Sequence, residues 1–241
     1  MNYGLQLYSV RDFTGKDLPG TLKKVAEMGY EFVEFAGFFG YSDVQIKAML
    51  DDYGLKAYAT HSGTACLLPE NIDETIRFHK GIGCGNFIIP GDDFSTNAKI
   101  DRFIDIMNFA QPKLLENGIK LHYHNHSSEF FPNQEGGFVH TELEKRTNIL
   151  FEIDTYWVYN ADMDPVATLE RLKDRIEVIH LRDGLKGGIP TALGEGKAPV
   201  LDVLKKCKEL GIKMIVEAEN EDPDGLAVVK RCADWLKKVD G

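Results

Sequence analysis

Short apolar segments alternate with amphipathic segments along the whole chain. Runs rich in Val, Ile, Tyr and Phe predict strands at residues 3–10, 32–36, 56–62, 86–90, 120–126, 149–156, 176–182 and 213–219. Apolar residues spaced three or four apart predict helices between them, clearest at 73–82, 97–118, 200–211 and 223–239 and after Asp164-Pro165. Four predicted strands follow a glycine that can end a helix in the left-handed conformation: Gly29, Gly54, Gly118 and Gly211.

The predicted strands begin at intervals of about 24 to 37 residues, which is the repeat of a βα unit. Eight such units without a linker predict a single-domain (β/α)8 TIM barrel that spans residues 1–241. A doubly wound open sheet is the competing fold. It would need a glycine-rich phosphate fingerprint after the first strand, and the segment Ser9-Val10-Arg11-Asp12-Phe13 is not one.

Composition narrows the class of partner. Hydrophobic residues make up 43% of the chain, enough for a large core, and no stretch is apolar enough to predict a membrane span. The 28 basic and 38 acidic residues leave a net charge of −10, which disfavours nucleic acid as a partner. The N-terminus Met1-Asn2-Tyr3-Gly4 lacks the pattern of a secretion signal, and the four cysteines form no CxxC pair. We therefore expect a cytoplasmic protein; a homo-oligomer is compatible with the sequence, which does not fix the oligomeric state.

Residues that can bind metals stand at the ends of the last four predicted strands. They are His124, Asp154, His180 and Glu217. Side chains alternate along a strand and neighbouring strands lie about 4.8 Å apart, so all four can point inward at one level of a barrel. Each alone could be a hydrogen-bonded structural residue, but four together favour one divalent ion. Two imidazoles and two carboxylates suit Mn²⁺, Zn²⁺, Co²⁺ or Fe²⁺, and suit Mg²⁺ less well.

A polar layer is expected beneath these residues. His122 and Glu152 lie two positions before His124 and Asp154, so strand alternation aims them inward one layer down. A buried carboxylate must be paired, so we predict contact between His122 and Glu152, with Glu34 or Gln6 as further members. Asp183 is expected to orient His180, because a metal-bound histidine usually donates its second ring N–H.

The segment Tyr123-His124-Asn125-His126-Ser127-Ser128-Glu129-Phe130 resembles the YHNHDFEF signature of the sugar phosphate isomerase/epimerase family. Ser127 and Ser128 replace Asp and Phe of that signature. The segments Asp154-Thr155-Tyr156-Trp157, His180-Leu181-Arg182-Asp183, Gly194-Glu195-Gly196-Lys197 and Val216-Glu217 follow in the family's order. The resemblance covers the whole chain and places it among the xylose-isomerase-like barrels.

The resemblance implies a metal-dependent sugar isomerase or epimerase that acts on a keto sugar through an enediolate formed at a divalent metal. In the relatives Glu, Asp, His and Glu hold the ion, which maps onto His124, Asp154, His180 and Glu217 here. His124 thus replaces a glutamate that the ketose 3-epimerases use as one of two acid/base partners. Trp157 replaces a histidine of those epimerases and of endonuclease IV, and either stacks on a sugar or covers the site.

Glu217 is the candidate base, with His124 or His126 as its partner acid. His61, Trp157 and Lys186 are candidate substrate contacts. A small-molecule sugar without phosphate is expected, because neither glycine-rich loop after strand seven forms a clear phosphate cradle. Two alternatives stay open: a 3-keto-glycoside or inosose lyase or dehydratase on the same scaffold, and a non-catalytic sugar-binding barrel. A nuclease is disfavoured by the net charge and by Trp157.

Overall fold

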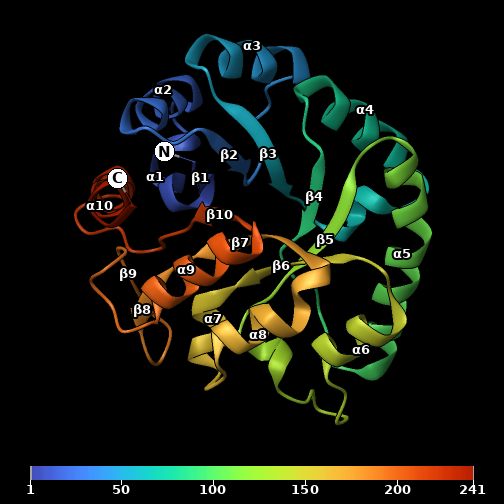
Figure 1. Cartoon of the computed structure of the whole chain (residues 1–241). Helices are drawn as coiled ribbons and strands as arrows, with labels where there is room; N and C mark the ends of the chain where they lie inside the picture. The colour runs from blue at the N-terminus through green and yellow to red at the C-terminus, as the bar shows by residue number, and fades with distance from the viewer. Residues whose placement is uncertain (1, 241) are drawn as a thin grey trace.

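Eight parallel strands close into a barrel in the computed structural model, which describes residues 2–240 (Figure 1). The strands are β1 (Gly4–Gln6), β2 (Phe32–Phe35), β3 (Lys56–His61), β4 (Asn86–Ile89), β5 (Lys120–His124), β6 (Leu150–Asp154), β7 (Ile176–Leu181) and β10 (Lys213–Val216). They follow one another around the barrel in chain order, and β1 pairs with β10 to close it. The predicted (β/α)8 barrel is confirmed; Met1 and Gly241 lie outside the described residues.

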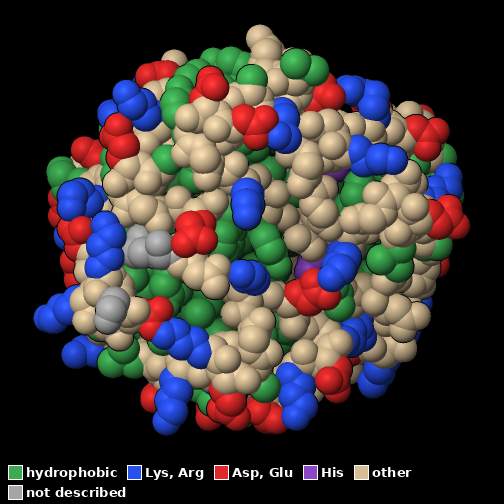
Figure 2. Space-filling model, turned by 45° about the horizontal axis from the view of Figure 1, so that its top comes forward, with side chains coloured by type: hydrophobic (Ala, Val, Ile, Leu, Met, Phe, Trp, Pro, Cys, Tyr) green, Lys and Arg blue, Asp and Glu red, His purple; other side chains and the backbone are tan. Residues whose placement is uncertain are grey.

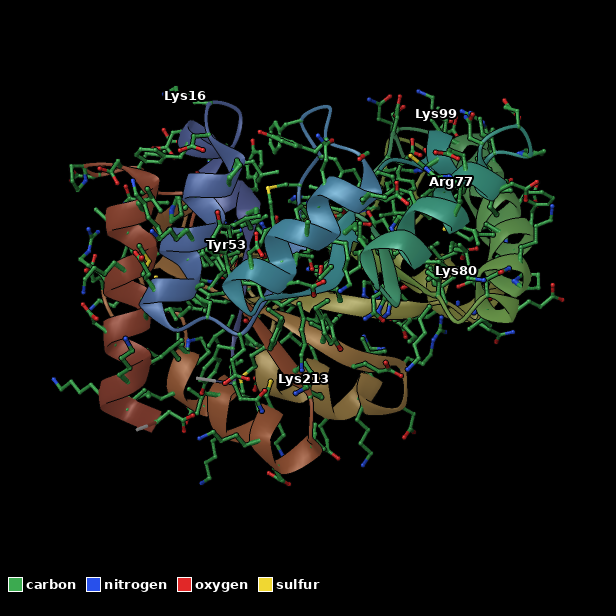
Figure 3. All side chains as sticks on the ribbon, turned by 90° about the horizontal axis from the view of Figure 1, so that it is seen from above. Lys16, Tyr53, Arg77, Lys80, Lys99 and Lys213 are labelled. Atoms are coloured by element: carbon green, nitrogen blue, oxygen red, sulfur yellow. The ribbon has the colours of Figure 1, made fainter. Side chains whose placement is uncertain are left out.

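A ring of helices covers the outside of the barrel (Figure 1). The helices are α1 (Arg11–Thr14), α2 (Leu18–Met28), α3 (Asp43–Tyr53), α4 (Ile72–Ile82), α5 (Asn97–Glu116), α6 (Val139–Arg146), α7 (Thr155–Asn160), α8 (Pro165–Leu172), α9 (Val200–Leu210) and α10 (Gly225–Asp240). In Figure 3, Lys16 and Lys99, near the starts of α2 and α5, lie toward one end of the molecule. Tyr53 and Lys80, in the last turns of α3 and α4, lie nearer the other end, so the helices run in a common direction.

Capping residues in the sequence explain where several helices begin and end. Ser42 and Gln45 form a reciprocal capping box at the start of α3. The carboxylate of Asp164 accepts two backbone N–H groups of α8, whose first residue is proline. Gly29 and Gly54 end α2 and α3 with φ of 98° and 68°, a conformation that favours glycine, as predicted.

The predicted strands are too long at the mouth of the barrel. The first ends at Gln6 rather than residue 10, because the Gln6 side chain accepts the N–H of Tyr8 and the chain turns into a 3₁₀ helix, Leu7–Val10. The sixth ends at Asp154, whose carboxylate caps α7. Two further elements were not predicted from the sequence: helix α6 and the antiparallel hairpin of β8 (Asp183–Leu185) and β9 (Ile189–Thr191).

The barrel interior is apolar at one end and polar at the other. Five buried residues form an apolar floor: Phe32, Ala59, Ile88, Val178 and Ile215. Above it the strand register is staggered, because barrel closure requires shear. His124 lies opposite Glu152, and Asp154 lies opposite His180. The expectation that four ligand residues share one level was therefore too simple, since adjacent strands are offset.

Among residues 2–240, no helix combines the length and apolarity needed to cross a membrane. Acidic and basic side chains are interspersed on the face shown in Figure 2 rather than separated by sign. That face offers no basic stripe of the kind that tracks a nucleic-acid backbone.

Candidate active site

A cavity of about 490 Å³ opens at the mouth of the barrel. It is lined by Tyr8, Ala36, Gly37, His61, Pro90, His124, His126, Glu217 and Glu219. These residues lie in or after the C-terminal ends of the strands, where TIM-barrel active sites lie. A larger groove of about 680 Å³ involves α8 and α9 on the outside, but it contains none of the predicted ligand residues. The size of the mouth cavity suits a small organic ligand.

The four predicted ligand residues converge beside this cavity. One donor atom from each of His124, Asp154, His180 and Glu217 lies within 4.8 Å of the others, and all four side chains are buried. His180 Nδ1 lies 3.0 Å from Glu217 Oε2 and 3.9 Å from Asp154 Oδ2. His124 Nε2 lies 3.5 Å from Asp154 Oδ2. This N₂O₂ arrangement, hereafter the upper cluster, is compact enough for one divalent ion.

The state of His124 supports the fit to a metal. Neither of its ring nitrogens has a hydrogen-bond partner within residues 2–240, although both are buried. Burial lowers the pKa of His124 to about 4, which keeps the imidazole neutral near pH 7. A neutral imidazole is the form that binds metals, and an orphaned buried nitrogen is costly without a partner.

Arg182 is a member of the site that the sequence analysis did not single out. Its side chain is 1% exposed, and Nη1 lies 3.0 Å from Asp154 Oδ2 and 2.8 Å from Glu217 Oε2. Nη2 contacts Glu219 at 3.0 Å. Burial opposes ionisation of Asp154 and Glu217, but Arg182 outweighs it and lowers the pKa of both carboxyls. A metal ion held by Asp154 and Glu217 would therefore have to compete with Arg182 for these carboxylates.

A second group, hereafter the lower cluster, lies beneath: Glu34, His61, Glu152 and His180. His61 Nε2 is 2.6 Å from Glu34 Oε1 and 2.8 Å from Glu152 Oε2, and Gln6 donates to Glu34. Burial and the neighbouring Glu34 raise the pKa of Glu152 to about 8. Burial disfavours protonated His61, but Glu34 and Glu152 together raise its pKa to about 9. The structure thus places Glu152, Glu34 and Gln6 in a polar layer, as predicted.

The predicted contact between His122 and Glu152 was wrong. His122 Nε2 contacts Asn86 Oδ1 at 3.0 Å, and its Nδ1 has no partner among the described residues. Strand register explains the error, because His122 lies opposite Leu150 rather than Glu152. Burial lowers the pKa of His122 to about 3, so this imidazole is neutral.

The family assignment rests on a match that spans most of the chain. A family model described as xylose isomerase-like TIM barrel matches residues 22–239. This chain belongs to that family.

Individual relatives within the xylose isomerase-like family differ in their reactions. The 2-oxo-tetronate isomerase of Haemophilus influenzae is 24% identical over 239 residues, covering 88% of this chain and 90% of that protein. The inosose dehydratase of Geobacillus kaustophilus is 23% identical, covering 86% and 84%. A crystal structure of a sugar phosphate isomerase/epimerase from Parabacteroides distasonis has a TM-score of 0.86 and 28% identity, covering 99% of this chain and 98% of that one.

Three histidines of the predicted site line the cavity of this xylose isomerase-like barrel: His61, His124 and His126. The side chain of His126 is 42% exposed. Behind His126, Glu129 Oε1 lies 3.7 Å from Nδ1. Burial disfavours protonated His126, but Glu129 outweighs it and raises the pKa of the imidazole. His126 is thus a titratable group at the cavity wall.

Two predicted substrate contacts, Trp157 and Lys186, do not line the cavity. The Trp157 ring packs against the Arg182 guanidinium, at 5.2 Å, and against the His126 ring, with the ring centroids 5.8 Å apart. Lys186 pairs with Asp162 at 2.5 Å on the surface and does not reach the cavity. The long Lys186 side chain turns toward the carboxylate of Asp162. The position of Lys186 in the sequence did not indicate this partner.

Asp183 does not orient His180 as expected. Its carboxylate accepts backbone N–H groups from Gly184, Gly194, Gly196 and Ala198 at 2.8–3.1 Å. It therefore holds the loop between β7 and α9 rather than the imidazole. Glu217 and Glu34 face the two ring nitrogens of His180 instead.

Glu129, near the end of the YHNHSSEF segment, has a structural role. Its carboxylate accepts hydrogen bonds from the Tyr123 hydroxyl at 2.7 Å, the backbone N–H of His126 at 3.0 Å and the Ser128 hydroxyl at 2.8 Å. Burial would raise the pKa of Glu129, but its interactions with His126, Tyr123 and Ser128 lower it to about 2. Glu129 thus braces the turn that carries His126.

We expect Glu129→Gln to lower the free energy of unfolding by about 1–3 kcal/mol, because a charged acceptor of three hydrogen bonds is lost. The folded-state pKa is depressed, so this stabilisation is complete above the unfolded pKa and is lost as the pH falls from about 4.5 toward 2. Urea denaturation of the parent and the variant between pH 7 and 3 measures it. A difference between the two proteins that stays constant down to pH 3 would contradict this assignment.

Proposed function

We propose that this protein is a metal-dependent sugar isomerase or epimerase that acts on a keto sugar. The observation that carries the proposal is the convergence of His124, Asp154, His180 and Glu217 within 4.8 Å beside a cavity of about 490 Å³. The small-molecule sugar expected from the sequence matches the cavity in size. The printed names of the relatives, an isomerase and a dehydratase, both describe chemistry that can begin with proton removal beside a carbonyl.

The upper cluster would hold one divalent ion, with Mn²⁺, Zn²⁺, Co²⁺ or Fe²⁺ suited to its N₂O₂ donors. Such an ion polarises a carbonyl and makes the adjacent C–H more acidic. The chain's own residues supply the remaining functions: they orient the sugar, hold the donors in place and move the proton.

Glu217 is the proposed base. The contacts that the structure gives to its carboxylate, from Arg182 and His180, are both to Oε2. No hydrogen bond to Oε1 is present within residues 2–240, and the side chain lines the cavity. One oxygen is therefore fixed while the other is available to accept a proton from the substrate.

His126 is the proposed acid. It lines the same cavity, and its ring is backed by Glu129, which stabilises the protonated imidazole. His124 is neutral and buried, which suits a ligand better than a proton donor. Return of the proton to the same carbon would epimerise the sugar, and return to the neighbouring carbon would isomerise it.

One observation favours a second candidate reaction. The proposed acid and base differ in kind, a histidine and a glutamate, instead of the paired glutamates expected for symmetrical proton exchange. A protonated His126 could instead assist departure of a group beyond the carbon that loses its proton. Cleavage or dehydration of a 3-keto glycoside or inosose is therefore the alternative on this scaffold.

Solvent exchange tests the proposal. The protein, loaded with Mn²⁺ or Zn²⁺, is incubated in D₂O with ketoses, 3-keto glycosides and inososes, and NMR follows deuterium at the carbon beside the carbonyl. We expect exchange with at least one class, and the product then separates isomer, epimer and eliminated sugar. Saturable sugar binding without exchange in any class would instead establish a sugar-binding barrel and overturn the proposed reaction.

A cytoplasmic location is part of the proposal. Cys66, Cys84, Cys207 and Cys232 are all free thiols, and three of them are buried. Free thiols are typical of a reducing compartment.

A further inference from the structure

We propose that the lower cluster is a second divalent-cation site, distinct from the upper one and joined to it through His180. Four donor atoms face one another: Glu34 Oε1, His61 Nε2, Glu152 Oε2 and His180 Nε2. The inference concerns ion binding and does not require the proposed reaction.

The four donor atoms lie within 4.8 Å of one another. The separations from His180, 3.1 Å and 3.3 Å, are near the roughly 3.4 Å between ligands of a tetrahedral ion. The separations from His61, 2.6 Å and 2.8 Å, are those of hydrogen bonds, so an ion would replace the His61 proton and move this ring away from the carboxylates. The donors come from β2, β3, β6 and β7, so the rigid wall of the barrel holds them.

Both carboxylates of this cluster are incompletely satisfied. Their second oxygens, Glu34 Oε2 and Glu152 Oε1, have no hydrogen-bond partner among the described residues, and both side chains are fully buried. Two carboxylates held this close to each other are stabilised by a cation between them or by a proton on one of them. Two imidazoles with two carboxylates, without thiolate or amide donors, are typical of Zn²⁺, Mn²⁺, Co²⁺ or Fe²⁺.

His180 links the two clusters. Its Nδ1 faces Glu217 in the upper cluster at 3.0 Å, and its Nε2 faces Glu34 in the lower one at 3.1 Å. A neutral imidazole has one N–H and one nitrogen that can bind an ion. With an ion in each cluster, His180 would release its remaining N–H proton to solvent and bridge the two ions as imidazolate, since metal binding displaces protons from its ligands. An ion would enter the lower cluster from the cavity past His61, whose side chain is 10% exposed and lines the cavity.

The alternative is that the lower cluster holds no ion and that protons on His61 and His180 balance its carboxylates. Metal stoichiometry distinguishes an ion from these protons. Protein stripped with a chelator is reloaded with Mn²⁺, freed of excess ion and assayed by elemental analysis and electron paramagnetic resonance. We expect two equivalents per chain in the parent and a spin-coupled signal from neighbouring ions. Glu34→Gln and His61→Gln should each retain one equivalent with an uncoupled signal, and His180→Ala should retain none.

Two further variants make the result specific. His122→Gln alters a buried, inward-facing histidine that belongs to neither cluster, so it should keep both equivalents. Glu217→Gln should lose only the upper ion. Circular dichroism checks folding, and His61→Gln, at the cavity wall, replaces Glu34→Gln should the latter not fold.

Each other outcome decides between the sites. One equivalent that survives in Glu34→Gln and His61→Gln but not in Glu217→Gln would overturn the lower site and leave the proposed function intact. One equivalent with the opposite dependence would establish the lower site and overturn the metal role of the upper cluster. No bound Mn²⁺ in the parent, followed by none with Zn²⁺, would overturn both.

Discussion

Glu217→Gln is expected to lower the rate of solvent-proton exchange into a keto sugar by about 10³-fold or more. Glu217 serves as both ligand and base in the proposed site, and general base catalysis alone contributes about 10²–10⁴-fold. The amide keeps the size of the side chain but can neither carry the negative charge nor accept the proton. The measurement is the initial rate of deuterium incorporation by NMR at saturating sugar, with metal content determined on the same sample.

Glu221→Gln is the matched control, because it makes the same chemical change on the same loop. Glu221 is 44% exposed, pairs with Arg11 and does not line the cavity. Its exchange rate should stay within about twofold of the parent, as for a surface ion pair remote from the site. If Glu217→Gln retained more than a tenth of the parent rate, another residue would have to be the base.

The barrel could be predicted because its signals are local. Gly29 and Gly54 mark helix ends by their freedom at positive φ, and the apolar strand segments recur at the spacing of a βα unit. The candidate ligand residues follow from the same logic, because alternation along a strand fixes which side chains point inward. His124, Asp154, His180 and Glu217 could thus be identified before their contacts were known.

The parts that could not be predicted depend on register and on long side chains. The shear of the barrel decides that His122 lies opposite Leu150, and no local pattern encodes that offset. Lys186 turns to Asp162, which is set by loop geometry. Arg182 could have been predicted from the sequence. It lies two residues after His180, so alternation along the chain points both side chains to the same side. The need to pair two buried carboxylates could have drawn attention to it.

Arg182→Met is expected to lower the free energy of unfolding of the metal-free protein by about 3–5 kcal/mol, as for removal of one partner from a buried ion pair. The variant removes the guanidinium that contacts Asp154 at 3.0 Å and Glu217 at 2.8 Å, and leaves His180 as their neighbouring titratable group. Methionine keeps much of the side-chain volume, so the loss reports charge more than packing. Urea denaturation in the presence of a chelator measures it.

Divalent metal should then stabilise Arg182→Met more than it stabilises the parent, because Arg182 and the ion compete for Asp154 Oδ2 and Glu217 Oε2. Binding to the folded state adds RT ln(1 + [L]/Kd), so removal of the competitor appears as a larger shift at equal Mn²⁺. Arg175→Met is the control: Arg175 donates to the backbone carbonyls of Ile149 and Glu144, so its variant should respond to Mn²⁺ as the parent does. Equal metal stabilisation of Arg182→Met and the parent would show that the ion does not bind between these carboxylates.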